Sequence, residues 1–212
     1  MTMRRTLLLG SLLILAMQGM LPATAARGGE TTDLCEIRVG MAVKDLPAAG
    51  YANFSCAAEP AVSLAGWQSW NDCRAGKDGL HAIHFGYDPQ VSREGTMVAG
   101  HPAVLTLLVD DHASVAGLLI ETDPKARLYM RKKAFLLGMQ AKSRYGDDGW
   151  SCTDVPRAAD QEPLGGTYVN TRCEKTTNGR AVTVEQRLFH RVDQDPKTFV
   201  DETRIAIMRA GN

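Results

Sequence analysis

The chain has 212 residues, of which 44% are apolar, and its 24 basic and 24 acidic side chains give a formal net charge of zero. This composition is typical of a folded globular protein. The balanced charge argues against a nucleic-acid partner, because phosphate binding requires an excess of basic residues on one face.

The first 25 residues have the pattern of a secretory signal peptide. Two arginines at positions 4 and 5 precede an apolar run over residues 7–17, and Ala-Thr-Ala at 23–25 fits the small-x-small cleavage rule. The run is shorter than the about 20 apolar residues of a membrane span, and an uncleaved N-terminal anchor is the alternative. Cleavage removes two arginines and no acid, so 22 basic side chains remain against 24 acidic ones, a net charge of −2. We expect an exported protein, periplasmic or secreted, with no membrane span after signal removal.

After a polar arm, the first predicted element is a short helix. Leu34, Ile37 and Met41 recur at helical spacing. Gly40 interrupts the series and is placed to end this helix. A loop-rich stretch over residues 57–79 follows.

Three segments in the first half predict antiparallel strands. Residues 80–87 alternate along one face, as a strand does. Residues 104–109 and 114–122 are both apolar, and the turn signal at 110–112 lies between them. These two segments therefore predict a hairpin.

The next predicted element is a helix over about residues 124–144. Asp123 is a good N-cap residue, and Pro124 suits the first helical position. An apolar stripe at helical spacing is expected to face inward. It consists of Ala126, Met130, Ala134, Leu137 and Ala141.

The C-terminal part predicts three more strands, at residues 167–174, 181–190 and 203–208. The dipeptide Asn-Gly at 178–179 is a typical two-residue hairpin turn. The first two of these strands are therefore expected to pair with each other.

Two passages of the chain follow the same order: Gly-Met, then Gly-aromatic, then a cysteine, a loop, a second cysteine and a hairpin. One passage runs from Gly40 to Cys73 and the other from Gly138 to Cys173. This degenerate repeat favours two similar units in tandem.

The five cysteines are expected to oxidise outside the cytoplasm. The repeat favours pairing within each half, which predicts the disulfides Cys56–Cys73 and Cys152–Cys173. Cys35 then stays unpaired, and we expect it to be buried, with an intermolecular bridge as the alternative. No C-x-x-C motif occurs, so neither a structural zinc site nor a thioredoxin-type site is predicted.

These elements together predict an α+β fold with a mainly antiparallel sheet and helices on one side. After a signal peptide at residues 1–25, the first unit is placed at 26–123 and the second at 124–212. The helix at about 124–144 joins them. One compact domain is the alternative to two separate units.

The sequence Ile-Arg-Val-Gly-Met-Ala-Val-Lys-Asp-Leu at 37–46 resembles the helix–Gly-Met–helix opening of small outer-membrane-assembly lipoproteins of the SmpA/OmlA type. The doubled arrangement with one disulfide per unit is similar to the secreted beta-lactamase inhibitory proteins. The resemblance covers residues 34–56 well and 134–174 loosely. It implies a non-catalytic protein that binds other proteins at the cell envelope, and it identifies neither a partner nor a binding residue.

Two groups of residues are candidates for a binding surface. The first is aromatic and lies near the cysteines; we expect these side chains to pack on the disulfides, and an aromatic surface for a sugar or protein partner is the alternative. It comprises Trp67, Trp70 and Trp150. The second is a basic cluster on the predicted helix. The alternative interpretation is that these residues form an ordinary solvated face of the helix. It includes Arg127, Arg131, Lys132 and Lys133.

The residues that could serve a catalytic or metal site have simpler structural interpretations. His81 and His84 would lie on opposite sides of their strand. The Asp-Asp-His at 110–112 falls at a hairpin tip, where a solvated turn is expected. The sequence contains no nucleophile elbow and no phosphate-binding loop. We therefore predict no catalytic residue, no metal site and no cofactor.

The favoured function is that of an exported, periplasmic, non-enzymatic protein that binds another envelope protein. A periplasmic protein that binds a small ligand or anionic lipid through the basic helix, with peripheral lipid contact, is the second hypothesis. An enzyme without a recognisable motif is the third.

Overall fold

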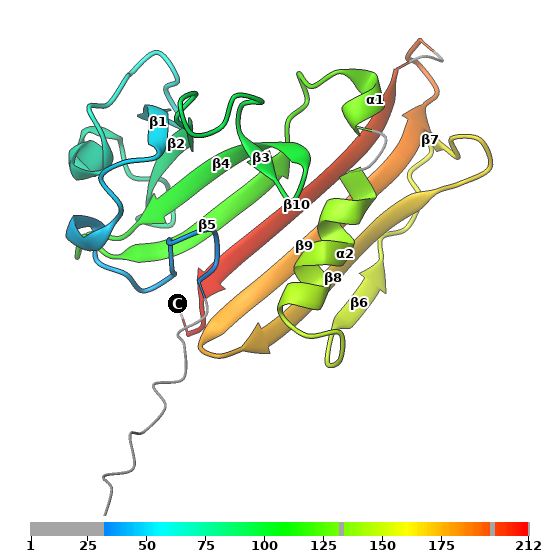
Figure 1. Ribbon diagram of the computed structural model, residues 1–212. Coiled ribbons are helices and arrows are strands. Elements are labelled where there is room, and N and C mark those ends of the chain that lie inside the picture. The colour runs from blue at the N-terminus through cyan, green and yellow to red at the C-terminus, as the bar shows by residue number, and fades with distance from the viewer. Residues whose placement is uncertain (1–31, 132–133, 196–197, 212) are drawn as a thin grey trace, which may run out of the picture. The chain divides into compact units, whose positions relative to one another are not determined.

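One antiparallel sheet extends through the part of the chain that the computed structural model describes, which is residues 32–131, 134–195 and 198–211 (Figure 1). The strands are β1 (Tyr51–Cys56), β2 (His81–Tyr87), β3 (Met97–Val98), β4 (His101–Val109), β5 (Val115–Thr122), β6 (Ser151–Asp154), β7 (Gln161–Glu162), β8 (Val169–Thr177), β9 (Arg180–Arg191) and β10 (Phe199–Arg209). The helical elements are η1 (Val43–Asp45), η2 (Trp67–Asp72), α1 (Leu128–Arg131) and α2 (Ala134–Arg144).

The strands hydrogen-bond in the order β1-β2-β4-β5-β10-β9-β8-β6, with β3 added to β4 and β7 added to β9. The strands before α2 thus form one run, and those after it form a second run in reverse order. The pairing of β5 with β10 joins the two runs. Both halves of the described chain therefore share one sheet.

The predicted α+β class with helices on one side is wrong, because the fold is mostly antiparallel sheet. Within the described residues, α2 is the only α-helix longer than four residues. The helix expected around residues 34–41 is absent: Leu34 and Ile37 form an isolated β-bridge, and Gly40 adopts a φ of 92°. The Gly40 N–H donates to the carbonyl of Val115, so this segment hydrogen-bonds to β5 and forms only isolated turns in place of a continuous helix.

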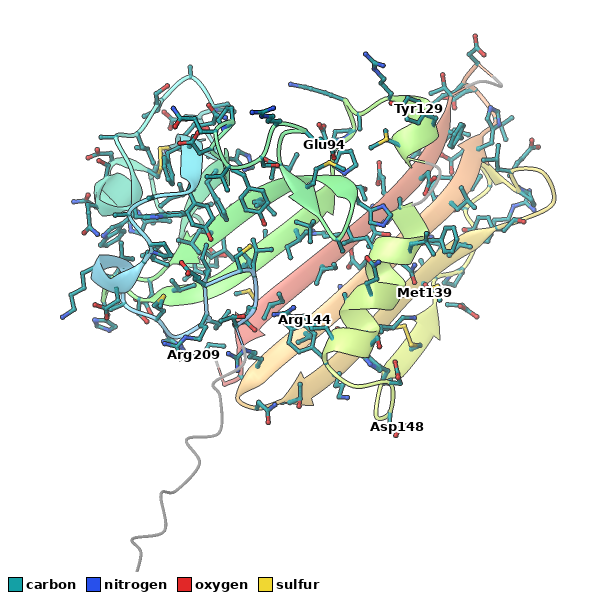
Figure 2. All side chains as sticks on the ribbon, in the orientation of Figure 1. Glu94, Tyr129, Met139, Arg144, Asp148 and Arg209 are labelled. Atoms are coloured by element: carbon teal, nitrogen blue, oxygen red, sulfur yellow. A yellow bond between two sulfur atoms is a disulfide. The ribbon has the colours of Figure 1, made fainter. Side chains whose placement is uncertain are left out.

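The helix predicted over residues 124–144 is shorter than expected. The carboxylate of Asp123 accepts a hydrogen bond from the Lys125 N–H (2.8 Å), which forms a local turn in place of the first helical turn. The inward stripe is confirmed only in α2, where Ala134, Leu137 and Ala141 are buried. On its outward side, Met139 is exposed (Figure 2).

The strand predictions are confirmed for the two hairpins, where typical turn residues lie between two segments predicted as strands. Strands β4 and β5 form the expected hairpin, and the Asp110 carboxylate accepts hydrogen bonds from the N–H groups of His112 and Ser114 in its turn. Strands β8 and β9 form the second hairpin, in which Asn178 and Gly179 both have positive φ. Positive φ at both central residues is the requirement of a type I′ turn.

The apolar core lies on one face of the sheet, beneath α2 and the segment 33–46. Side chains alternate along each strand, so every second residue faces this core. Its fully buried members include Ile37, Ile83, Leu105, Leu107, Leu118, Leu137, Val182, Ile205 and Ile207.

An aromatic cluster packs beside the first disulfide. Trp67 is 5% exposed, and its ring lies edge-on to Phe54 (4.6 Å between centroids) and Phe85 (4.9 Å). Its indole N–H donates to the carbonyl of Pro47 at 2.9 Å. Trp67 is therefore a core residue and offers little surface for binding. It belongs to the same buried cluster as Cys56 and Cys73.

Both predicted disulfides are present. Cys56–Cys73 ties β1 to the end of η2, and Cys152–Cys173 joins directly opposed residues of β6 and β8. Cys35 is unpaired as expected, but it is exposed, because it sits in a turn of the segment that covers the sheet. Two disulfides indicate an oxidising compartment outside the cytoplasm.

The predicted signal peptide lies outside the described residues. Among the residues that are described, none of the helices has the length and apolar character required to cross a bilayer.

The first disulfide should contribute strongly to stability. Replacing both partners (Cys56→Ser with Cys73→Ser) opens a loop of 17-residue separation. We expect the free energy of unfolding to fall by about 3 kcal/mol, as the loop-closure model predicts. Urea denaturation followed by tryptophan fluorescence measures this, with Cys35→Ser as the matched control. Equal stability of the double variant and the control would contradict the prediction.

Alkaline pH should destabilise the fold through Tyr51. Burial, followed by the nearby Cys35, raises the pKa of Tyr51 from 10.0 to about 12. The unfolded state therefore loses this proton first, so the stability present below pH 10 declines as the pH rises toward 12. Urea unfolding across that range should show a smaller decline for Tyr51→Phe. The same change at the exposed Tyr129 is the control and should leave the decline unchanged.

Candidate functional site

The face of the sheet opposite α2 is rich in charged side chains. Its members follow from the strand register, because residues that alternate with the core positions must point to this side. From β8, β9, β10 and β5, the charged ones are Arg172, Glu174, Glu185, Arg187, Arg191, Glu202, Arg204 and Glu121. We call this side the open face.

Four of these residues form a row across four adjacent strands. Glu121 on β5 lies opposite Arg204 on β10, which lies opposite Glu185 on β9. Glu185 in turn lies opposite Arg172 on β8. Acidic and basic side chains alternate along the row, and opposite charges at facing positions stabilise antiparallel strands. We call Glu121, Arg204, Glu185 and Arg172 the Arg–Glu ladder.

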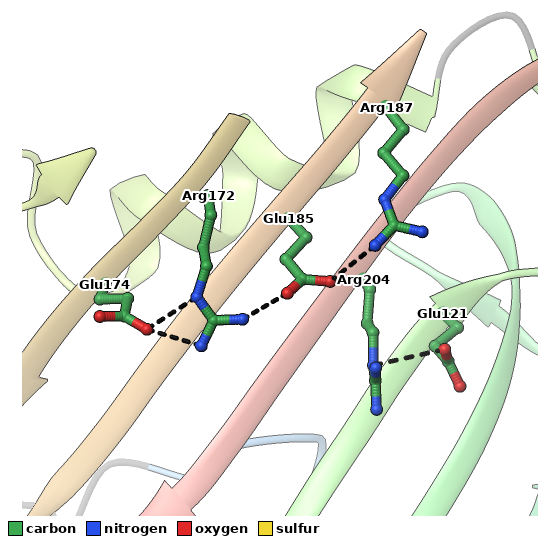
Figure 3. Close-up of polar contacts among 6 residues, drawn as sticks. All are labelled: Glu121, Arg172, Glu174, Glu185, Arg187 and Arg204. Carbon is green, nitrogen blue, oxygen red and sulfur yellow. Dashed lines mark hydrogen bonds and ion pairs between the residues drawn. The ribbon is translucent and has the colours of Figure 1, made fainter. Parts of the chain in front are cut away.

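Ion pairs join the members of the ladder two by two, Arg172 with Glu185 and Arg204 with Glu121 (Figure 3). Arg172 contacts Glu185 through Nη1, and its Nε donates to Glu174 at 2.8 Å. Hydrogen bonding to Glu174 raises the pKa of the Arg172 guanidinium above its ordinary value. Arg204 Nε lies 3.4 Å from the Glu121 carboxylate. The side chains are thus held in fixed pairs rather than left to move independently.

Glu185 is the most enclosed carboxylate of the ladder. Its side chain is 18% exposed, against 40% for Glu121. It contacts Arg172 on one side and Arg187 (3.5 Å) on the other, and it faces Arg204 across the strand pair. This carboxylate therefore contacts two guanidinium groups, those of Arg172 and Arg187.

Three adjoining hollows on the open face meet at Glu185. Their volumes are about 390, 370 and 270 Å³, and Glu185 lines all three. His84 also lines the first hollow, and Phe189 also lines the third. The ladder therefore lies at the floor of a hollowed surface.

Apolar side chains border the ladder in the second hollow. They are Leu108, Leu119, Ala206 and Met208. A patch that combines arginines with apolar side chains has the composition of a protein interface core.

The two histidines of β2 point to opposite sides, as predicted. His81 lies on the core side, where its Nδ1 is 2.6 Å from the Cys73 carbonyl oxygen and its ring is edge-on to Trp70. His84 lies on the open face, and its Nδ1 is 3.0 Å from the Thr106 hydroxyl. Within the described part of the chain, no group of three or more His, Cys, Asp or Glu residues is arranged to hold a metal ion.

The predicted aromatic surface does not assemble around one site. Trp67 is in the core and Trp70 packs on His81. Trp150 belongs to the other half, where its indole N–H donates to the Gly146 carbonyl and Lys175 lies 5.8 Å from its ring. None of the three lines a hollow of the open face.

The predicted basic cluster is only partly described. Arg127 is exposed ahead of α1, and Arg131 is the last residue of that helix. Lys132 and Lys133 lie outside the described residues. The basic residues farther along α2 contact neighbouring elements: Lys142 lies 3.9 Å from the Cys173 sulfur, and Arg144 donates to Thr32.

The Arg–Glu ladder was missed by reasoning from the sequence. A signal for it exists, because three strands carry opposite charges two residues apart: Arg172 with Glu174, Glu185 with Arg187, and Glu202 with Arg204. Residues two apart share one face of a strand. The pattern indicates three charged strand faces, but it does not give the register that places them side by side.

Comparisons with protein-family models, with curated proteins and with solved structures gave no significant match to this chain.

The enclosed position of Glu185 gives a stability prediction. Glu185→Gln keeps the shape of the side chain but leaves Arg172 and Arg187 without its negative charge. We expect the free energy of unfolding to fall by about 1 kcal/mol, within the range for hydrogen bonds to charged groups that are partly screened. Glu121→Gln, at the more exposed end of the ladder, is the control and should change stability by less than about 0.5 kcal/mol. Equal effects in urea denaturation would contradict a central role for Glu185.

Proposed function

We propose that this chain is a non-enzymatic protein that binds another protein through the open face of its sheet. The observation that carries the proposal is the position of Glu185, where three hollows share one ion-paired floor. A small ligand would fill one enclosed cavity. Adjoining open hollows over four strands instead suit a broad, convex protein surface.

The chemistry of the open face favours recognition by directional pairing. Four arginines accompany four glutamates on this face, so the surface has no large excess of either charge. A guanidinium binds a carboxylate through a planar fork, and such pairs give geometric specificity. The ladder holds its arginines in position before the partner arrives, which lowers the entropic cost of binding.

The expected partner therefore presents both charges around a small apolar group. The apolar group would enter the hollow that contains Leu108, Leu119 and Met208. Its acidic and basic side chains would pair with the outer, exposed ends of the ladder. Partners with a single strong charge would be disfavoured, because they would face like charges at alternate positions.

The proposed setting is the bacterial cell envelope, in the periplasm or after secretion. The two disulfides support a location outside the cytoplasm. The leader-like pattern of residues 1–25 and the resemblance to envelope proteins support the finer assignment, which remains a prediction.

The second and third hypotheses receive less support. Binding of anionic lipid through the basic helix would use Arg127, Arg131 and their neighbours, but Lys142 and Arg144 farther along contact Cys173 and Thr32. An enzyme would use the first hollow, which is lined by both His84 and Glu121. The Glu121 carboxylate there is paired with Arg204, as expected for a structural ladder.

Site-specific crosslinking tests the proposal. A photo-crosslinking residue at Thr183, which lines the second hollow, should give a discrete adduct in envelope extracts. The same residue at Met139, exposed on the outer side of α2, is the matched control and should give none. Glu185→Arg should abolish the Thr183 adduct, because it reverses the central charge. An adduct that survives Glu185→Arg, or no adduct from Thr183, would refute binding through this face.

A further inference from the structure

A separate cavity lies on the side of the sheet opposite the open face, between α2 and the core face. Its volume is about 420 Å³, within the range of small-molecule sites. The lining is predominantly apolar. It includes Leu34, Val98, Ile120, Leu137, Ala141, Ile205 and Ile207.

Rigid elements form the walls of this cavity. Ile205 and Ile207 of β10 provide the floor, and Leu137 and Ala141 of α2 provide one side. The other side is the turn after β3, where Ala99 has a φ of 50°. The cavity is therefore built from packed secondary structure rather than from one loose loop.

Polar groups gather at one end of the cavity. The Tyr145 hydroxyl donates to the Asp33 carboxylate at 3.0 Å, and Arg180 Nε lies 2.6 Å from the same carboxylate. Asp33 and Arg180 thus balance each other's charge. Arg144, in the last turn of α2, adds one positive charge at this end.

Arg144 links the apolar cavity to a small polar hollow. That hollow has a volume of about 70 Å³ and is lined by Arg144, Tyr145, Thr177, Asn178 and Arg180. The guanidinium of Arg144 is exposed, and its Nη2 donates to Thr32. A guanidinium has five N–H donors, so it can contact Thr32 and an anion together.

We propose that this cavity binds a single-chain carboxylate, such as a free fatty acid. The acyl chain would lie between α2 and β10, against Ile205 and Ile207, and the carboxylate would face Arg144. The apolar lining suits the chain, and the net positive charge at the rim suits an anionic head group. This site is separate from the open face and does not depend on the function proposed for it.

The unpaired thiol provides a reporter of occupancy. Cys35 lines the cavity, and its sulfur lies 3.4 Å from the Tyr87 hydroxyl. Because the other four cysteines are in disulfides, a thiol reagent labels Cys35 selectively in the oxidised protein. A bound acyl chain should slow this labelling.

The experiment titrates the oxidised protein with carboxylates from hexanoate to dodecanoate, below their micelle-forming concentrations. Calorimetry measures affinity, and iodoacetamide measures the alkylation rate of Cys35. Each added methylene should tighten the dissociation constant about four-fold, which corresponds to about 0.8 kcal/mol, until the cavity is full. Decanoate should slow alkylation in proportion to its occupancy. No saturable heat and an unchanged alkylation rate at every chain length would overturn the proposal.

Variants locate the head group and the chain. Arg144→Gln should weaken decanoate about ten-fold and leave decanol unchanged, because only the carboxylate pairs with the guanidinium. Val98→Trp should abolish binding of both by filling the cavity. The matched controls on the open face, Arg204→Gln and Val155→Trp, should change neither.

Two outcomes of the variants would refute the assignment. If Arg144→Gln binds decanoate as well as the unaltered protein does, the head group is not at Arg144. If Val98→Trp folds and still binds both ligands, the chain is not in this cavity. If Val98→Trp fails to fold, the chain-length series on the unaltered protein still shows whether carboxylates bind and protect Cys35.

Discussion

The pairing of β5 with β10 is the interaction that makes one structure out of two halves. Five facing pairs join these strands, from Arg204 opposite Glu121 to Met208 opposite Gly117. A Cβ atom at Gly117 would lie 2.4 Å from the Met208 sulfur, so a larger residue there would displace the Met208 side chain. The pairing brings together residues 83 (Arg204 and Glu121) to 91 (Met208 and Gly117) positions apart. Without it, neither the core beneath α2 nor the charged row on the other side would be continuous.

Alternation along these central strands separates two kinds of chemistry by the thickness of one sheet. On β10, Ile205 and Ile207 face the core, whereas Arg204 and Met208 face solvent on the open side. The charged residues are therefore held on a rigid support whose other face is buried. Ion pairs between exposed side chains contribute little stability. The ladder is better explained as an ordered surface for recognition than as a source of stability, apart from the enclosed Glu185.

The sequence could predict those features whose causes are local. Asn178-Gly179 determines a hairpin turn wherever it occurs between two alternating segments, and the order of the cysteines favoured the correct disulfides. The prediction of a helix from the spacing of Leu34 and Ile37 was wrong. Irregular backbone that hydrogen-bonds to β5 can bury apolar side chains at the same spacing as a helix does. The ladder depends on the register between strands distant in sequence. Its paired charges were visible in the sequence, but their alignment was not.

The two proposed sites share β10, which raises the question of whether they communicate. An acyl chain would touch Ile205 and Ile207, and a protein partner would touch Arg204 and Met208 on the opposite side of the same strand. Coupling requires an element with two discrete arrangements that both ligands bias. Strand β10 is hydrogen-bonded on both sides, to β5 and to β9. A shift of its register by one residue would turn Ile205, Ile207 and the other core-facing side chains to the charged face, so the strand has one register. The sheet therefore acts as a partition, and occupancy of one side should leave the affinity of the other side unchanged.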